Sequence, residues 1–156
     1  MALSANIRKV KPEDIRCISL MEQKCFSGST AYSRRQIRYL ALKANSTCLV
    51  ETQGNIVRGF IIVLYRRGSK AAGIETIDVD PAFQKKGIGL RLLSAAEHDM
   101  KNHTVTRSRL EVSEGNKAAV GLYKKMGYIF QKRLPNYYKY EHNGTRNAIR
   151  LFKILQ

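Results

Sequence analysis

Two glycines near the middle of the chain, Gly87 and Gly89, lie in the run Gln84-Lys85-Lys86-Gly87-Ile88-Gly89-Leu90. The preceding residues, 74–79, alternate in character and are rich in β-branched side chains, which predicts a strand. The following residues, 89–101, predict a helix. Glycine lets a ligand approach the backbone closely, and the N–H groups at a helix start attract anions. The pattern therefore predicts a loop that binds a phosphate or pyrophosphate.

Residue identities exclude two common phosphate-binding motifs. A dinucleotide-binding fingerprint requires a third glycine at the position of Leu92. A P-loop requires Gly-Lys-Ser/Thr, whereas Gly89 is followed by Leu90 and Arg91. What remains is Gln-x-x-Gly-x-Gly between a strand and a helix. Taken alone, this hexapeptide fits either a ligand-binding loop or a plain glycine-containing turn.

Gln-x-x-Gly-x-Gly resembles the acetyl-CoA loop of the GNAT acetyltransferases, and a second run, residues 110–128, makes the resemblance specific. It reads Leu-Glu-Val-Ser-Glu-Gly-Asn-Lys-Ala-Ala-Val-Gly-Leu-Tyr-Lys-Lys-Met-Gly-Tyr. It is similar to the family's other acetyl-CoA motif, in which a strand is followed by Asn-x-x-Ala and a helix that ends in Leu-Tyr-x-x-x-Gly-Tyr/Phe. Within the family, the chain looks most like the RimI-type ribosomal-protein alanine N-acetyltransferases. The resemblance covers about residues 74–154.

The resemblance assigns the catalytic roles to two side chains. Glu111 would accept the proton of the attacking amine, directly or through water, and Tyr123 would protonate the sulfur that leaves. Without the resemblance, both residues also fit purely structural roles. Glu111 lies next to Arg109 in an ion-pairing position, and Tyr123 fits the buried face of a helix. Glu75 is a second candidate for the base, since many members of the family carry a glutamate near this part of the preceding strand.

The resemblance also implies how acetyl-CoA binds. The backbone of the strand would pair with the pantetheine arm, the glycine loop would surround the pyrophosphate, and an asparagine would hydrogen-bond the cofactor. The residues with these roles are Ile77, Asp78 and Val79 for the strand, Lys85, Lys86, Gly87, Ile88, Gly89 and Leu90 for the loop, and Asn116. Asp78 departs from the small or apolar residue expected in RimI-type proteins, which places a carboxyl where it can alter recognition of the amine.

The elements that position these residues follow from the hydrophobic pattern. We expect strands at residues 6–10, 47–51, 56–65, 74–79, 107–113, 128–134 and 148–154, and helices at 12–25, 34–43, 89–101 and 117–126. The strand at 56–65 is continuously apolar at its centre and should be central in the sheet. This order predicts one α/β (α+β) domain over residues 1–156, with a mixed sheet of six to seven strands and about four helices. The resemblance adds a splayed strand pair that holds acetyl-CoA.

Composition limits the partners and the compartment. The chain has 28 Lys+Arg against 12 Asp+Glu, a net charge of +16, which favours polyanionic partners or reflects a generally basic surface. Its three cysteines, Cys17, Cys25 and Cys48, suggest neither a disulfide framework nor a zinc site. We expect them to be reduced and mostly buried in a reducing compartment, the cytoplasm. Residues 1–7 contain no apolar leader core, no apolar run is long enough to span a membrane, and no metal site is expected.

The expected function is acetyl transfer from acetyl-CoA to the N-terminal α-amine of a protein, with a ribosomal protein as the leading acceptor. Weak association of the basic surface with the ribosome or RNA fits this function. One alternative is a small-molecule amine acetyltransferase, and another is a noncatalytic module that binds CoA or the ribosome. We expect the first helices and the Tyr137-Tyr138 segment to select the acceptor.

Overall fold

The structure is a computed structural model that describes residues 4–26 and 28–156. The first three residues of segment 1–7 therefore lie outside the described residues. The strands are β1 (Ala5–Lys9), β2 (Ser46–Gln53), β3 (Ile56–Tyr65), β4 (Ala71–Val79), β5 (Arg107–Ser113), β6 (Ile129–Leu134) and β7 (Ala148–Ile154). The α-helices are α1 (Ile15–Cys25), α2 (Arg34–Arg38), α3 (Ile88–Asn102) and α4 (Lys117–Lys125). Short 3-10 turns occur at Pro12–Asp14, Gly28–Thr30 and Pro81–Phe83, and a π-helical turn at Tyr39–Lys43.

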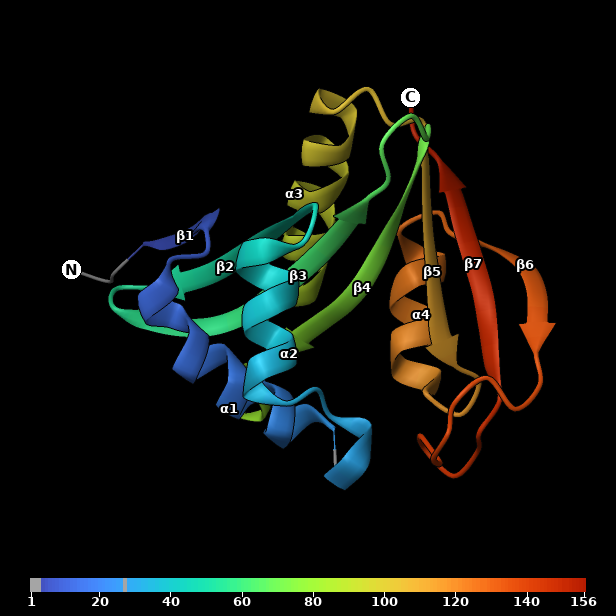
Figure 1. Ribbon diagram of the computed structural model, residues 1–156, viewed down its shortest axis with the longest axis horizontal. Helices are drawn as coiled ribbons and strands as arrows, with labels where there is room; N and C mark the ends of the chain where they lie inside the picture. The colour runs from blue at the N-terminus through green and yellow to red at the C-terminus, as the bar shows by residue number, and fades with distance from the viewer. Residues whose placement is uncertain (1–3, 27) are drawn as a thin grey trace.

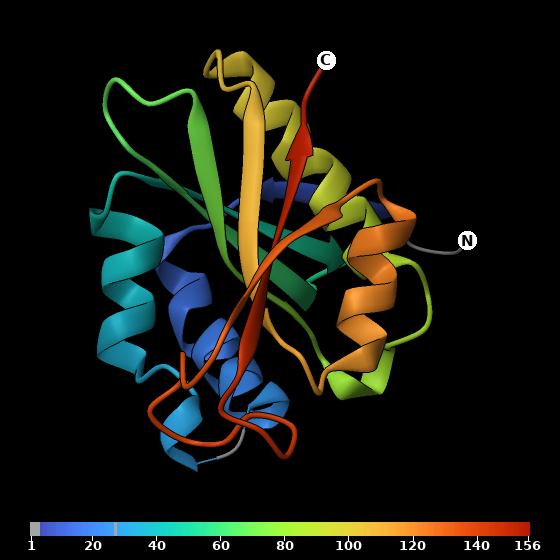
Figure 2. The ribbon, with the colours of Figure 1, turned by 90° about the vertical axis from the view of Figure 1, so that its right-hand side faces the viewer.

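The strands form one mixed sheet in the order β1-β2-β3-β4-β5-β7-β6. β4 and β5 are parallel, and every other neighbouring pair is antiparallel. Helices α1 and α2 cover one face of the sheet, while α3 and α4 cover the other (Figures 1 and 2). The expected mixed sheet with about four helices is therefore confirmed.

The core consists of two apolar clusters, one on each face of the sheet. Residues 60–63 of β3 are completely buried, as expected for a central strand. Because successive strand side chains point to opposite faces, Ile61 packs in one cluster with Leu92 of α3, and Ile62 packs in the other with Ile18 of α1. The two clusters hold the helices in place on both sides of β4 and β5.

Several element boundaries differ from the expectation, most of them by one to three residues, and the differences in β4 and in the helix expected at 34–43 are the most informative. β4 begins at Ala71, three residues before the predicted start, because Ala71 pairs in parallel with Arg107 of β5. This pairing joins distant parts of the chain, so the sequence around Ala71 contains no local pattern that predicts it. The helix expected at 34–43 is α2 followed by the π-helical turn. Its start is capped by Ser33, whose Oγ accepts a hydrogen bond of 3.1 Å from the backbone N–H of Gln36.

The expectation that the cysteines are mostly buried is wrong. All three thiols are free, but Cys48 alone is buried, Cys25 is half-buried and Cys17 is exposed. Cys17 precedes the buried Ile18 by one position, which on an α-helix turns its side chain away from the core. Within the described residues, no helix is long and apolar enough to cross a membrane. The same part of the chain contains no group of three or more His, Cys, Asp or Glu side chains that could hold a metal ion.

Candidate active site

The site is organised around a divergence of β4 and β5. The two strands pair only from Ala71↔Arg107 to Ile74↔Leu110. Beyond this point β4 stays paired with β3 as far as Val79, whereas β5 stays paired with β7 as far as Ser113. The strands therefore separate toward their carboxyl ends (Figure 1), and the splayed pair expected from the sequence is present.

A β-bulge in β4 marks the start of this divergence. Ile62 of β3 pairs with Thr76, and the next residue, Val63, pairs with Ile74. Glu75 is consequently an extra residue on β4 without a partner in β3. A bulge bends its strand and increases the local twist, so it contributes to the separation of β4 from β5.

A cavity of 840 Å³ lies at the splayed strands and is lined by residues 74–79 of β4 and 110–113 of β5. The glycine loop, the start of α3, the inner face of α4 and the end of α1 also line it, together with Phe26, Thr30, Tyr32, Tyr138, His142 and Asn143. The structure thus brings together most of the residues that the sequence singled out: Ile77, Asp78, Val79, Lys85, Gly87, Ile88, Gly89, Leu90, Glu111, Asn116 and Tyr123. Lys86 does not line the cavity.

The glycine loop presents the start of α3 to the cavity. Gly87 immediately precedes α3 and has φ of 78°, a left-handed conformation that favours glycine. No side chain in the described part of the chain caps this helix start, so its first N–H groups and the positive end of the helix dipole remain available to an anion. Gly89 lies where α3 meets α4, and a Cβ there would make ordinary van der Waals contact with Cδ2 of Leu122 at 3.4 Å. The phosphate-binding role of the loop stays a prediction.

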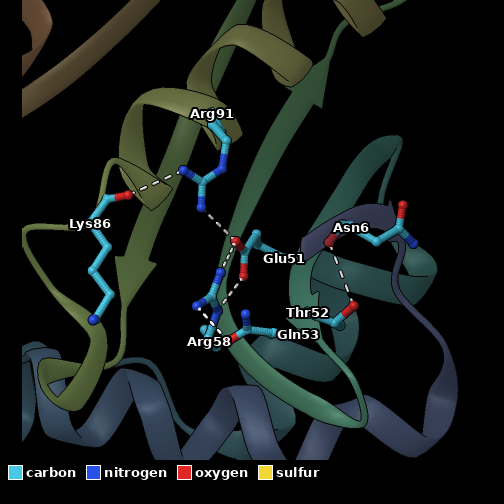
Figure 3. Close-up of polar contacts among 7 residues, drawn as sticks. All are labelled: Asn6, Glu51, Thr52, Gln53, Arg58, Lys86 and Arg91. Carbon is cyan, nitrogen blue, oxygen red and sulfur yellow. Dashed lines mark hydrogen bonds and ion pairs between the residues drawn. The ribbon is translucent and has the colours of Figure 1, made fainter. Parts of the chain in front are cut away.

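A buried ion-pair network holds the glycine loop in place against the sheet (Figure 3). Glu51 of β2 is completely buried and accepts hydrogen bonds from Arg58 Nε and Nη2 at 2.8 and 2.5 Å. Arg91 of α3 donates to the same carboxylate at 2.8 Å and, through its Nη1, to the backbone carbonyl of Lys86 at 3.1 Å. Burial acts to raise the pKa of Glu51, but the arginine hydrogen bonds outweigh it and the pKa is lowered. Arg91 therefore ties the loop to a carboxylate fixed in the sheet.

Asn116 starts α4 at the cavity wall. Its Oδ1 accepts a hydrogen bond of 3.2 Å from the backbone N–H of Ala119, which caps the helix. The amide nitrogen takes no part in this cap, so one side chain can serve as the cap and contact a ligand.

Tyr123 is both a core residue and part of the cavity wall. Its side chain is 5% exposed and packs edge-to-face against Tyr128, with 5.9 Å between ring centroids. Its hydroxyl makes no hydrogen bond to the part of the chain that the structure describes. Burial raises the pKa of Tyr123, and the nearby charge of Asp78 raises it further. The hydroxyl therefore keeps its proton at neutral pH, as a proton donor must.

Glu111 lies across the cavity on β5. Its Oε2 is 3.8 Å from Nε of Arg109 and 3.6 Å from Nε of Arg150, the residue opposite it on β7. Leu110 and Val112 point to the buried cluster on the α3 side, so Glu111 faces the other way. The carboxylate is thus both ion-paired and part of the cavity wall.

The end of the cavity next to α1 contains residues that carried no sequence motif. Tyr32, from the segment between α1 and α2, donates a hydrogen bond from its hydroxyl to Oε1 of Glu75. Burial and this bond raise the pKa of Tyr32. Glu22 of α1 and Tyr138 line the same end. Only the expectation that the first helices and the Tyr137-Tyr138 segment select the acceptor pointed to this region.

The cavity wall is acidic, although the protein is strongly basic. Four of the twelve acidic residues line it, together with two of the 28 basic ones. The acidic residues are Glu22, Glu75, Asp78 and Glu111, and the basic residues are Lys24 and Lys85. Lys24 is paired with Asp80 at 3.2 Å, whereas Lys85 belongs to the glycine loop. One cavity therefore offers a helix start and a lysine at one end, and carboxyls elsewhere.

Comparisons with known proteins match this chain to a family model and to several acetyltransferases. The family model of the acetyltransferase (GNAT) family matches residues 15–128. N-alpha-acetyltransferase 30 of Xenopus laevis is 29% identical over 126 residues, which cover 79% of this chain and 45% of that protein. The [ribosomal protein bS18]-alanine N-acetyltransferase of Escherichia coli (strain K12) is 34% identical over 78 residues, or 50% of this chain and 52% of that protein. The matches thus span about half the length of these curated relatives.

Among solved structures, the ribosomal-protein-S18-alanine N-acetyltransferase of Escherichia coli superposes with a TM-score of 0.87 at 23% identity. The superposition covers 98% of this chain and 95% of that one, so the two proteins share a fold over their whole length. The family model covers most of the chain and includes the glycine loop, Glu111 and Tyr123. The chain belongs to the acetyltransferase (GNAT) family.

Proposed function

We propose that the protein transfers an acetyl group from acetyl-CoA to the N-terminal α-amine of a protein, with a ribosomal protein as the leading acceptor. The observation that carries this proposal is the single cavity at the splayed strands, which joins a helix start suited to phosphate with Glu111, Tyr123 and an acidic end. A donor that carries phosphates and an acceptor that carries an ammonium group would enter such a cavity from opposite ends.

The residues of the donor end fit acetyl-CoA. No strand pairs with the side of residues 75–79 that faces away from β3 within the described chain, so this backbone can pair with the amide groups of pantetheine as an added strand. The start of α3 and Lys85 would hold the pyrophosphate. Asn116 would contribute a further hydrogen bond.

The chemistry requires two proton transfers around one acyl transfer. The nitrogen lone pair of the neutral amine attacks the thioester carbonyl, the new C–N bond forms, and the C–S bond breaks with its electron pair on sulfur. Glu111 takes the proton that the nitrogen loses, and Tyr123 gives its proton to the sulfur. Transfer of the proton from Glu111 to Tyr123 through solvent restores both groups. Acid–base catalysis of this kind contributes about 10²- to 10⁴-fold to a rate.

The acceptor class rests on the relatives and on charge. The relatives are named for N-alpha-acetylation and for acetylation of an alanine of ribosomal protein bS18. An α-amine has a pKa near ~8, so it arrives mainly as an ammonium at pH 7 and is attracted by the four cavity carboxyls. The same carboxyls would attract a polyamine, which keeps a small-molecule acceptor as the second candidate. A cytoplasmic location and contact of the basic surface with the ribosome or RNA belong to this proposal.

A thiol-release assay with acetyl-CoA tests the acceptor class. The panel consists of lysine-free peptides with a free α-amine, Nα-acetylated peptides that contain lysine, and spermidine. We expect turnover mainly on the first group. Turnover on spermidine alone would transfer the assignment to the small-molecule alternative. CoA binding without turnover on any amine would favour the noncatalytic module.

A further inference from the structure

Two buried carboxyls, Glu22 of α1 and Asp78 of β4, form an acidic pair in the cavity wall that the reaction above does not use. Each residue is 1% exposed, and both line the cavity. The carboxyl end of α1 packs against the carboxyl end of β4, where Cys25 Sγ donates to the carbonyl of Val79 at 3.3 Å. The pair therefore lies at the end of the cavity next to α1 and beside the splayed part of β4. We call this the acceptor end.

One oxygen of each carboxyl is held in place and the other is not. Glu22 Oε2 accepts a hydrogen bond of 3.0 Å from the backbone N–H of Tyr32, and Asp78 Oδ1 accepts one of 2.7 Å from Thr76 Oγ1. The remaining oxygens, Glu22 Oε1 and Asp78 Oδ2, are buried and have no hydrogen-bond partner in the described chain. The two carboxyls adjoin each other, so the only hydrogen bond left to these oxygens is a proton shared between them. Two adjoining buried carboxyls without another donor are costly, so their presence in a cavity wall points to a cationic ligand that donates hydrogen bonds.

Among the described residues, no basic side chain forms an ion pair with either carboxyl of the pair. The titratable side chains that face it are Cys25 from α1, Cys48 from β2, Tyr32 and, from α4, Tyr123. All four are neutral at pH 7, because burial raises the pKa of each one. Burial, and then the adjacent Glu22 carboxyl, holds the pKa of Asp78 well above its usual range. Two adjoining buried carboxyls resist ionising together, so the pair shares one proton and carries one negative charge at rest.

We propose that Glu22 and Asp78 form the site at which the ammonium group of the acceptor docks and loses the first of its two protons. This proposal rests on the proposed function, since an ammonium must lose two protons to become an amide. On docking, the ammonium displaces the shared proton to solvent and donates N–H bonds to Oε1 and Oδ2. One N–H bond then breaks, its electron pair stays on nitrogen, and the proton returns to the pair. The second proton leaves during attack, to Glu111.

These steps balance, and they use only the acceptor, side chains of the protein and solvent. The pair ends in its resting state, the amine becomes neutral and nucleophilic, and one proton passes to solvent for each ammonium that docks. The ligand class is a primary alkylammonium, which supplies three N–H donors to two unsatisfied oxygens. A neutral acylated amine supplies one N–H and no charge, so the product would bind weakly to the pair and leave.

Binding calorimetry with CoA in place of acetyl-CoA tests docking without turnover. The probe is an alanyl tripeptide amide without lysine, and its Nα-acetylated form is the matched control ligand. Titration in two buffers of different ionisation enthalpy gives the number of protons released. We expect close to one proton from the wild-type protein, and none from Asp78→Asn or Glu22→Gln, with binding about tenfold weaker. The acetylated peptide should bind all three proteins alike.

Glu13→Gln is the matched control variant, because it removes one negative charge from the exposed segment before α1, at the opposite end from the cavity. Its affinity for the free peptide and its proton release should equal those of the wild type. Equal proton release and equal affinity for the free peptide in wild type and Asp78→Asn would overturn the proposal. Glu22→Gln provides the same test if one variant fails to fold.

The pH dependence of kcat/KM separates docking from a structural role. We expect Asp78→Asn to lose about tenfold at pH 7 and to recover above pH ~8, where the α-amine arrives neutral. A loss of the same size at every pH would contradict the proposal. Failure of the proposed function gives a different result, namely no acetylation of any peptide while the ammonium still binds with proton release.

Discussion

At the scale of single residues, Tyr123 shows how one side chain can belong to the core and to the reaction. Its ring is buried against Tyr128, yet the residue lines the cavity and its hydroxyl has no hydrogen-bond partner in the described chain. A buried tyrosine hydroxyl usually finds a partner. Its position beside the splayed strands therefore suits contact with the sulfur of the donor.

Tyr123→Phe keeps the ring and removes only the hydroxyl. We expect kcat to fall by about 10²-fold or more, with little change in the KM for acetyl-CoA and no loss of thermal stability. Steady-state kinetics and a thermal melt check both expectations. Tyr128→Phe is the matched control, because its hydroxyl is bonded to Ser108 at 2.7 Å and to Glu97 at 3.0 Å. That variant should lose roughly 1–3 kcal/mol of stability and retain kcat. A Tyr123→Phe protein with full kcat would remove Tyr123 from the acid role.

Glu111 of β5 and Glu75 of β4 are the two candidates for the base. Substitution of each glutamate by glutamine, its isosteric amide, distinguishes them. Glu111→Gln should lower kcat by about 10²-fold, because the amide cannot accept the proton. Glu75→Gln weakens the bond from Tyr32 and should mainly raise the KM for the acceptor. The measurement is kcat and KM for both variants across the pH range of activity. Full activity of Glu111→Gln together with inactive Glu75→Gln would reassign the base to Glu75.

At the scale of elements, the strand, glycine loop and helix at residues 74–101 were predictable because their signals are local. Alternation, a glycine pair and helical spacing all occur within a few residues. The start of β4 at Ala71, the contact of Arg91 with Glu51, and the approach of Glu22 to Asp78 were not predictable. Each depends on pairing or packing between distant segments, which a local pattern does not contain. The motif residues were found by resemblance, whereas the acceptor end needed the fold.

Arg91 links helix α3 to the glycine loop that precedes it, and Arg91→Ala tests this link. Glu51 keeps its two hydrogen bonds from Arg58 in this variant, so we expect the fold to persist. The loop loses the bond to the Lys86 carbonyl, worth about 1 kcal/mol, and the KM for acetyl-CoA should rise about fivefold. The kcat at saturating acetyl-CoA should change little. Arg67→Ala removes an equal charge from the exposed turn before β4, and an equal rise in its KM would show that only net charge matters.

At the scale of the whole molecule, the charge distribution separates the surface from the site. The chain carries +16, while its cavity contains a third of its acidic residues. The basic surface suits large anionic partners, and the acidic cavity suits a small cationic group. A protein whose surface and cavity carry charges of opposite sign can approach a polyanionic assembly and still accept an ammonium group. The buried pair within that cavity should also cost the molecule stability.

Asp78→Asn measures this cost through the pH dependence of unfolding. The pKa of Asp78 is raised in the folded state, so the wild-type protein loses stability as pH rises from the unfolded value near ~3.9 through the folded pKa. The variant escapes that loss. We expect a higher Tm than the wild type at pH 7 and a difference that vanishes as pH falls toward ~4; each kcal/mol corresponds to about 2–4 °C.

Asp14→Asn is the control of opposite sign for this experiment. Asp14 is hydrogen-bonded by Arg8 at 2.7 Å, and its pKa is lowered by that bond despite partial burial. Its stabilisation is present above the unfolded pKa and is lost as pH falls through the folded pKa. Asp14→Asn should therefore lower the Tm at pH 7, where Asp78→Asn raises it. If Asp78→Asn also lowered the Tm at pH 7, Asp78 would be a stabilising residue, and the buried pair would not be a strained site held for a ligand.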